Sequence, residues 1–138
     1  MRIAISRRGV TLTELMVVLT ILGVVAGLAV PNYFRTLEVS RSNEARANLN
    51  VIHMGQKIYK LNNNRYWPGG GGTDTTLSNI NSNLNIDITT TFYTLSVTSG
   101  AGTGAAATYS ATASRGNTGA KTFTITQAGT ITESGSYG

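Results

Sequence analysis

The sequence predicts an α+β protein in which one long N-terminal helix precedes a small antiparallel sheet. The first observation behind this prediction is an apolar stretch, residues 15–30, that contains no charged side chain. The second is a helical spacing of apolar residues that continues beyond that stretch. The third is a C-terminal half rich in Ser, Thr and Gly, with short β-type segments between glycine-rich turns. With 138 residues, the chain is long enough for one ordinary domain.

The first half-helix, residues 10–33, is predicted to span a membrane. Residues 10–30 form a helix about 31 Å long, which matches a bilayer core of about 30 Å. Three arginines precede the apolar stretch and none lies within it, which places the N-terminal side in the cytoplasm. Pro31 is expected to kink this helix without ending it, since proline is tolerated in membrane helices.

The second half-helix, residues 34–62, is predicted to be amphipathic. Charges of alternating sign mark its solvent side, and the run of asparagines at 62–64 is expected to end it. Apolar residues recur at helical intervals on the other side. These residues are Phe34, Leu37, Ala45, Leu49, Ile52 and Tyr59.

The remaining residues, 63–138, are predicted to form a globular head. A breaker stretch at 66–72 and a polar loop at 73–90 precede the strands. Short links between successive strands favour an antiparallel meander that packs on the amphipathic half-helix. The predicted strands are residues 91–98, 106–114, 121–127 and 130–133.

Composition argues against an enzyme and against several binding functions. The chain has no cysteine and a single histidine, His53, so thiol chemistry and imidazole metal clusters are excluded. Asp74 and Asp87 are too few for a calcium loop, and we expect no metal, no cofactor and no catalytic residue. The net charge of +5 comes mainly from three arginines in residues 1–9, so the head offers no basic surface for nucleic acid.

The chemistry-bearing residues lie where the apolar stretch begins. Glu14 immediately precedes the apolar stretch. Burial of an unpaired carboxylate in a membrane costs up to about 2–3 kcal/mol of insertion free energy. A cut after Gly9 would give Val10 a free amine, which is a cation that can pair with the glutamate of a neighbouring chain. We therefore expect Glu14 to act between subunits.

These residues resemble the N-terminal signal of the type IV pilin and type II secretion pseudopilin family, Gly, then an aromatic, then Thr-Leu-x-Glu. The likeness covers Gly9, Thr11, Leu12 and Glu14 and continues through the apolar helix to Pro31. It implies cleavage between Gly9 and Val10 by a membrane prepilin peptidase, and N-methylation of Val10. Beyond residue 68 the likeness is only architectural. The family's frequent C-terminal disulfide loop is absent.

The same resemblance implies a structural subunit of a helical filament of many copies, with no enzymatic activity. The precursor is expected in the inner membrane, beside an assembly platform, and the mature subunit in an extracellular pilus that serves adhesion or motility, or in a periplasmic pseudopilus that serves secretion. Residues 1–9 are then a leader peptide. The expected subunit contacts are Val10, Leu12, Glu14, Gly23, Gly27 and Pro31.

The N-terminal sequence departs from the family pattern at two positions, and one alternative to prepilin processing is compatible with it. Val10 and Thr13 depart from the family's usual aromatic and aliphatic residues. The alternative is an ordinary secretory signal, in which Gly27 and Ala29 are the small residues before the cut. Cleavage after Ala29 would release residues 30–138 as a soluble binding domain. That alternative leaves Thr-Leu-Thr-Glu before the apolar stretch unexplained. Gly23 and Gly27 form a GxxxG pattern, which permits close helix packing in lipid, although glycine is common in membrane helices generally.

Overall fold

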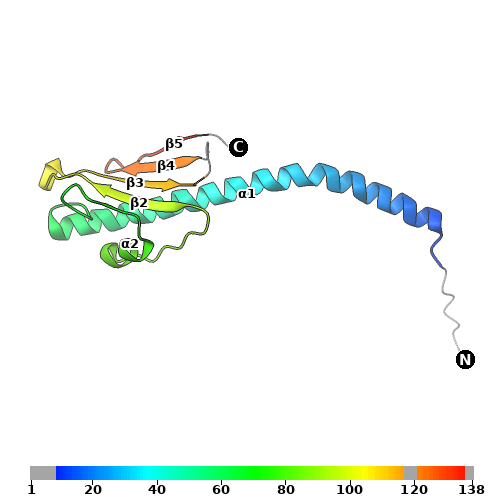
Figure 1. The fold of residues 1–138 in the computed structure, drawn as a ribbon, viewed down its shortest axis with the longest axis horizontal. Helices are drawn as coiled ribbons and strands as arrows, with labels where there is room; N and C mark the ends of the chain where they lie inside the picture. Colours follow the sequence, from blue (N-terminus) through cyan, green and yellow to red (C-terminus); the bar gives the residue numbers. More distant parts are fainter. Residues whose placement is uncertain (1–8, 117–120, 136–138) are drawn as a thin grey trace, which may run out of the picture. The chain divides into compact units, whose positions relative to one another are not determined.

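The computed structural model describes residues 9–116 and 121–135. The chain divides into two compact units, Met1–Leu37 and Glu38–Gly138, and each is described by itself below. The prediction of an α+β arrangement is confirmed by one long helix and a five-stranded antiparallel sheet (Figure 1).

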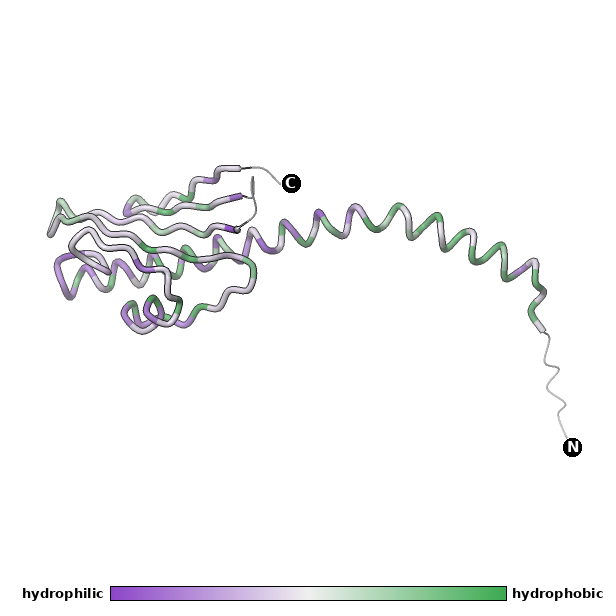
Figure 2. Tube along the Cα trace, viewed as in Figure 1, coloured by the Kyte–Doolittle hydropathy of each residue, from purple (hydrophilic) through white to green (hydrophobic). Residues whose placement is uncertain are grey.

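Helix α1, Leu12–Asn63, covers both predicted half-helices and passes through Pro31 without a break. It is long and apolar enough near the N-terminus to cross a membrane, and its most apolar window is not buried against any part of the structure. Figure 2 shows this hydrophobic stretch in green along the first part of the helix. At the other end, Asn64 has a positive φ of 56° and donates its N–H to the carbonyl of Lys60. The asparagine run therefore ends the helix as predicted.

In the second unit the sheet is an antiparallel meander in sequence order. It contains one strand more than predicted, because a short edge strand precedes the four expected ones. Each pair of neighbours is antiparallel. The strands are β1 Thr73–Asp74, β2 Thr94–Ser99, β3 Tyr109–Ser114, β4 Thr122–Thr126 and β5 Ile131–Ser134.

Two strands begin three residues later than predicted. Before β2, the hydroxyl of Thr90 donates to the carbonyl of Tyr93 and accepts from its N–H, which closes a turn over the expected strand start. Before β3, a short 3₁₀ helix, Gly104–Ala106, occupies the expected start. Local hydrogen bonding in both places competes successfully with the β propensity of the sequence.

A second helix, α2 Leu77–Leu84, lies in the segment predicted to be a polar loop, so that prediction was wrong. Its N-terminal end is fixed by Asp74, whose carboxylate accepts hydrogen bonds from the N–H of Thr76 and the amide of Asn79. Ile80 and Leu84 are buried, which supplies the stability that its Asn and Ser residues do not. The helical spacing of Leu77, Ile80 and Leu84 was the sequence signal that could have predicted this helix.

The core of the second unit lies between one face of α1, helix α2 and the inner face of the sheet. Ala45, Leu49 and Ile52 of α1 are buried, as the amphipathic pattern predicted, whereas Phe34, assigned to the same face, is 61% exposed. Full burial of each large apolar side chain contributes about 1.5–3 kcal/mol. The sheet contributes the alternate residues Leu95, Val97, Ala111, Ala113, Phe123 and Ile125 to the same cluster.

A buried amide ties α1 to the chain that leaves it. Gln56 is fully buried, donates to the carbonyl of Trp67 at 2.7 Å and accepts the Trp67 N–H at 3.0 Å. This pair of bonds satisfies two backbone groups that lie outside any helix or strand. Four aromatic side chains are also buried in this core, those of Tyr66, Trp67, Tyr93 and Tyr109. Tyr137 lies outside the described residues.

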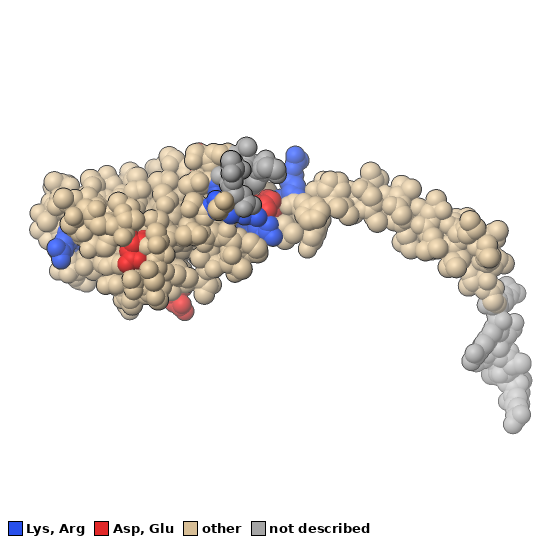
Figure 3. Space-filling model, in the orientation of Figure 1, with Lys and Arg blue, Asp and Glu red and all other residues tan. Residues whose placement is uncertain are grey.

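Charged side chains of the second unit form ion pairs near its first and last elements. Glu38 pairs with Arg41 of α1 at 2.6 Å and with Arg115, which follows β3, at 2.8 Å. Arg46 pairs with Glu133 of β5 at 2.7 Å. In the view of Figure 3, the head shows only small, separate groups of charged atoms on an otherwise uncharged surface.

Candidate assembly site at the start of the N-terminal helix

Thr11 and Glu14 form a reciprocal pair of hydrogen bonds at the start of α1. The Glu14 N–H donates to Thr11 Oγ1 at 3.3 Å, and the Thr11 N–H donates to Glu14 Oε2 at 2.9 Å. The Thr11 hydroxyl also donates to Glu14 Oε2 at 2.9 Å. This is a capping box, in which side chains satisfy backbone donors that the first helical turn leaves free.

Thr-x-x-Glu before an apolar run is a known sequence signature of a capping box. From the sequence, Glu14 was expected to act only between subunits, so its local role in the capping box was missed. Thr11-x-x-Glu14 was the signal that could have found it. The glutamate therefore has a partner already in the single chain, which lowers the cost of a carboxylate at this position before assembly.

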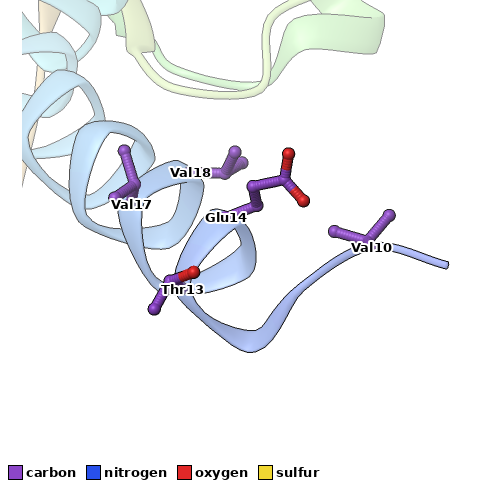
Figure 4. Close-up of a pocket in the computed structure, with 5 residues that line it drawn as sticks. All are labelled: Val10, Thr13, Glu14, Val17 and Val18. Carbon is purple, nitrogen blue, oxygen red and sulfur yellow. The ribbon is translucent and has the colours of Figure 1, made fainter.

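The carboxylate lies beside apolar side chains on an exposed surface. Figure 4 shows Glu14 between Val18 and Val10, with Thr13 and Val17 on a neighbouring side of the first turns. These five residues line a shallow, open hollow. In the described part of the chain the bonds from Thr11 use Oε2, so Oε1 remains available to a second donor.

The predicted cleavage site lies outside regular structure. Gly9 and Val10 precede the first helical residue and are exposed, with Val10 75% accessible. A peptidase needs an accessible peptide bond outside regular secondary structure, and both residues of the Gly9–Val10 bond are exposed and precede the helix. The structure thus places Val10 and Glu14 together at the same end of the helix.

The other predicted contact residues lie elsewhere along the same helix. Leu12 is exposed in the first turn. Gly23 and Gly27 share one face four residues apart, and a Cβ atom at either position would meet no atom within 4 Å. Pro31 lies within the helix and is also exposed. Within residues 9–116 and 121–135, therefore, nothing covers the surface that these four residues present.

The second unit offers little that resembles a catalytic or metal site. Within the described residues, no three His, Asp or Glu side chains gather as metal ligands would. The carboxylate of Asp74 accepts hydrogen bonds from the N–H of Thr76 and the side-chain amide of Asn79, and these bonds hold its pKa below the usual range. His53 is buried to 9% exposure and hydrogen-bonds through Nδ1 to the hydroxyl of Tyr109. It therefore packs in the core, as a lone histidine usually does.

We expect the stability of the head to depend on His53 near neutral pH. Burial, helped by the nearby positive charge of Lys57, lowers the pKa of His53 below 6.5. The unfolded chain then binds a proton more readily than the folded one, so this contribution is complete above pH 6.5 and is lost as pH falls through the folded pKa. The free energy of unfolding should fall on acidification below that value.

Denaturation of the full chain in detergent at a series of pH values measures this dependence. His53→Gln should flatten the profile from about pH 6.5 downward, where the lowered pKa of His53 makes the wild type lose stability. The carboxylates of Asp74 and Glu133 have lowered pKa values, so their losses fall below pH 4.5 and remain separable. An unchanged slope in His53→Gln would assign the dependence to another group.

Comparisons with known proteins define the class of the N-terminal segment. The model of the prokaryotic N-terminal methylation motif matches residues 5–30, which include Gly9, Val10 and Glu14. The chain is thus a protein with a prepilin-type N-terminus and a pilin-like α+β fold, homologous to type IV pilins and type II secretion pseudopilins. The resemblance drawn from the sequence is confirmed.

Three relatives illustrate this homology. The type IV major pilin protein PilA of Myxococcus xanthus (strain DK1622) is 39% identical over 59 residues, which are 43% of this chain and 27% of that protein. The type II secretion system core protein G of Pectobacterium carotovorum subsp. carotovorum is 43% identical over 60 residues, 44% of this chain and 38% of that protein. The Escherichia coli (strain K12) core protein G is 38% identical over 66 residues, 48% of this chain and 46% of that protein.

The matches thus span less than half the length of each of these relatives. No solved structure matches the chain. The prediction of a non-enzymatic protein agrees with the relatives, which are named as a pilin and as secretion-system core proteins.

Proposed function

We propose that this chain is the structural subunit of a type IV pilus-like filament, polymerised through its N-terminal helix. The observation that carries the proposal is the exposed apolar half of α1, whose start holds an exposed Glu14 beside Val10. Apolar surface of this extent needs lipid or other copies of the helix to cover it. The homology to pilins and pseudopilins supports the second as the final state.

In this proposal residues 1–9 are a leader, residues 10–33 the membrane and filament-core half-helix, residues 34–62 the amphipathic half-helix and residues 63–138 the head. Prepilin peptidase cuts between Gly9 and Val10, and Val10 is N-methylated. The new N-terminal amine of one copy donates a hydrogen bond to Oε1 of Glu14 in a neighbouring copy and forms an ion pair with it. An inner-membrane platform then moves each subunit from the bilayer into the filament.

A pseudopilin of a type II secretion system is the second candidate. It is favoured by the names of several relatives, which are core protein G of such systems. Both candidates use the same N-terminal chemistry, since each requires a processed helix and a filament of copies. They differ in location, because the pilus extends outside the cell and the pseudopilus stays in the periplasm.

Intact-mass and N-terminal peptide mass spectrometry of membrane and sheared surface fractions tests this proposal. A mature chain that begins at Val10 with one added methyl group is the expected result. A chain that begins near Val30 would overturn the proposal, because that cut removes both Glu14 and the helix. Electron microscopy of the sheared fraction then separates a surface pilus from a periplasmic pseudopilus.

A further inference from the structure

The outer face of the sheet carries hydroxyl groups at every outward position of β2, β3 and β4. Along these strands, buried apolar residues alternate with exposed or half-buried Ser and Thr. The pattern continues on β5, whose Thr132 and Ser134 pair with outward residues of β4. We call this set the hydroxyl face. Its members are Thr94, Ser96, Thr98, Ser110, Thr112, Ser114, Thr122, Thr124, Thr126, Thr132 and Ser134.

The strand register aligns these hydroxyl residues in rows across the sheet. One row runs through four strands, because Ser96 pairs with Thr112, Thr112 with Thr124, and Thr124 with Thr132. A second row joins four strands from the β1 edge onward. In it, Thr73 pairs with Thr98, Thr98 with Ser110, and Ser110 with Thr126.

Backbone geometry fixes the spacing of this array. Hydroxyl residues in a row are about 4.8 Å apart, and successive rows are about 6.8 Å apart along a strand. The threonine side chains are stiff at χ1, so their hydroxyl and methyl groups keep this spacing. Strand propensity accounts for threonine but not for the serines, which have no such preference.

Charge and aromatic rings are missing from the outward positions of the described strands. Glu133, the acid of β5, is turned to the helix side, where it pairs with Arg46 of α1. The tyrosine of β3 and the phenylalanine of β4, Tyr109 and Phe123, are buried on the inner face. Figure 3 agrees with a head surface that is largely uncharged.

These properties select the partner. A nucleic acid needs cations for its phosphates and rings for its bases, and the hydroxyl face has neither. A lipid surface needs an apolar or basic face. Ser and Thr hydroxyls each donate one hydrogen bond and accept two, which suits an uncharged partner that is itself covered with hydroxyl groups. A rigid, crystalline partner loses little conformational entropy when it binds to this fixed array of hydroxyl groups, whereas a flexible chain in solution loses much.

We propose that the hydroxyl face binds the surface of an insoluble, uncharged crystalline polysaccharide. The face measures about 14 Å by 17 Å, far below the roughly 800 Å² per partner of a stable protein interface. One copy therefore binds weakly, and many copies in register bind strongly through multivalency. This last step rests on the filament proposed above, where the heads repeat along the surface.

Proteoliposomes that carry many copies of the full chain test the face without requiring a filament. They are mixed with microcrystalline cellulose and sedimented, and the bound fraction is measured. Wild-type proteoliposomes should sediment with the cellulose. The double variant Thr112→Val, Thr124→Val removes two central hydroxyls and keeps the β-branched shape, so its binding should be about tenfold weaker.

Thr89→Val is the matched control, because Thr89 is exposed in the loop before β2 and outside the sheet. Its binding should equal that of the wild type. Fluorescence of the buried Trp67 verifies that each variant is folded. Thr124→Lys, which places a charge in the middle of the face, is a second variant and should also weaken binding.

No sedimentation of the wild type, or equal sedimentation of the double variant, would overturn the proposal. Preferential binding to ice crystals over cellulose would overturn it too, because ice offers the same lattice of donors and acceptors without a polysaccharide. Filament formation is scored separately by electron microscopy. Cellulose binding without filaments would therefore refute the proposed function alone, and filaments without cellulose binding would refute this inference alone.

Discussion

Glu14→Ala should insert into the membrane and be cleaved normally, yet its filament yield should fall by at least about tenfold. In the proposed filament, the alanine leaves the neighbour's Val10 amine without its carboxylate in the apolar core. Removal of one partner from a buried ion pair costs about 3–5 kcal/mol, which exceeds a hundredfold in an equilibrium constant. Sheared surface protein, quantified against the membrane-bound pool, measures the yield.

Two variants separate the charge of Glu14 from its local capping role. Glu14→Gln keeps an acceptor for the Thr11 N–H, since glutamine also serves in a capping box, but it carries no charge. It should lose filaments as severely as the alanine variant. Thr11→Ala removes the hydroxyl that caps the Glu14 N–H and keeps the carboxylate, so it should retain most of the yield.

The comparison is decisive because the two roles predict opposite orders. If helix capping were the function of Glu14, Thr11→Ala would lose filaments and Glu14→Gln would keep them. Normal filaments from Glu14→Gln would thus refute pairing with a neighbour's amine. Normal membrane levels and Val10 N-termini in all three variants exclude failure at an earlier step.

Phe123→Ala should destabilise the head more than other truncations of its sheet. Phe123 of β4 has no exposed surface and packs edge-to-face on Tyr93, with ring centroids 5.8 Å apart. Its removal leaves a cavity between the sheet and α1. A Phe-to-Ala change at such a site costs about 3–5 kcal/mol, a large part of the roughly 5–15 kcal/mol that stabilises a typical domain.

Chemical denaturation of the full chain in detergent, followed by the fluorescence of Trp67, measures this loss. Trp67 is the single tryptophan and is 6% exposed, so it reports on the head alone. Phe92→Ala is the matched control. Phe92 is 40% exposed and its ring lies 4.1 Å from the guanidinium carbon of Arg41, so its loss should cost less than about 1 kcal/mol.

Equal losses in the two phenylalanine variants would contradict the burial that the structure assigns. The Phe123→Ala chain should still insert and be cleaved, because Gly9, Val10 and the apolar half of α1 lie in the other unit. Processing and head stability should therefore vary independently between the Glu14 and Phe123 series.

The long helix and its start were predictable from the sequence because their signals are local. Uninterrupted apolar residues, charges of alternating sign and an asparagine run are properties of neighbouring residues, and they gave helix bounds close to Leu12–Asn63. The methylation motif at residues 5–30 is equally local. The capping box was also written in the sequence, although its meaning was missed.

Tertiary structure decided what local signals leave open. Helix α2 is stable because Ile80 and Leu84 pack in the core. The Asn and Ser residues of this segment do not themselves favour a helix, so their presence did not predict it. Strand β1 is only two residues long and exists through its pairing with β2. Gln56 is buried because the chain folds back after the helix and places the backbone of Trp67 within hydrogen-bond distance of its amide. No spacing rule predicts such a contact.

The hydroxyl face also depends partly on local sequence and partly on tertiary structure. Sequence by itself determined that Ser and Thr alternate with apolar residues along each strand, since that pattern has a period of two. The register between strands decided that Ser96, Thr112, Thr124 and Thr132 stand in one row. Register depends on how all strands pack on the helix at once, so only the folded structure contains it.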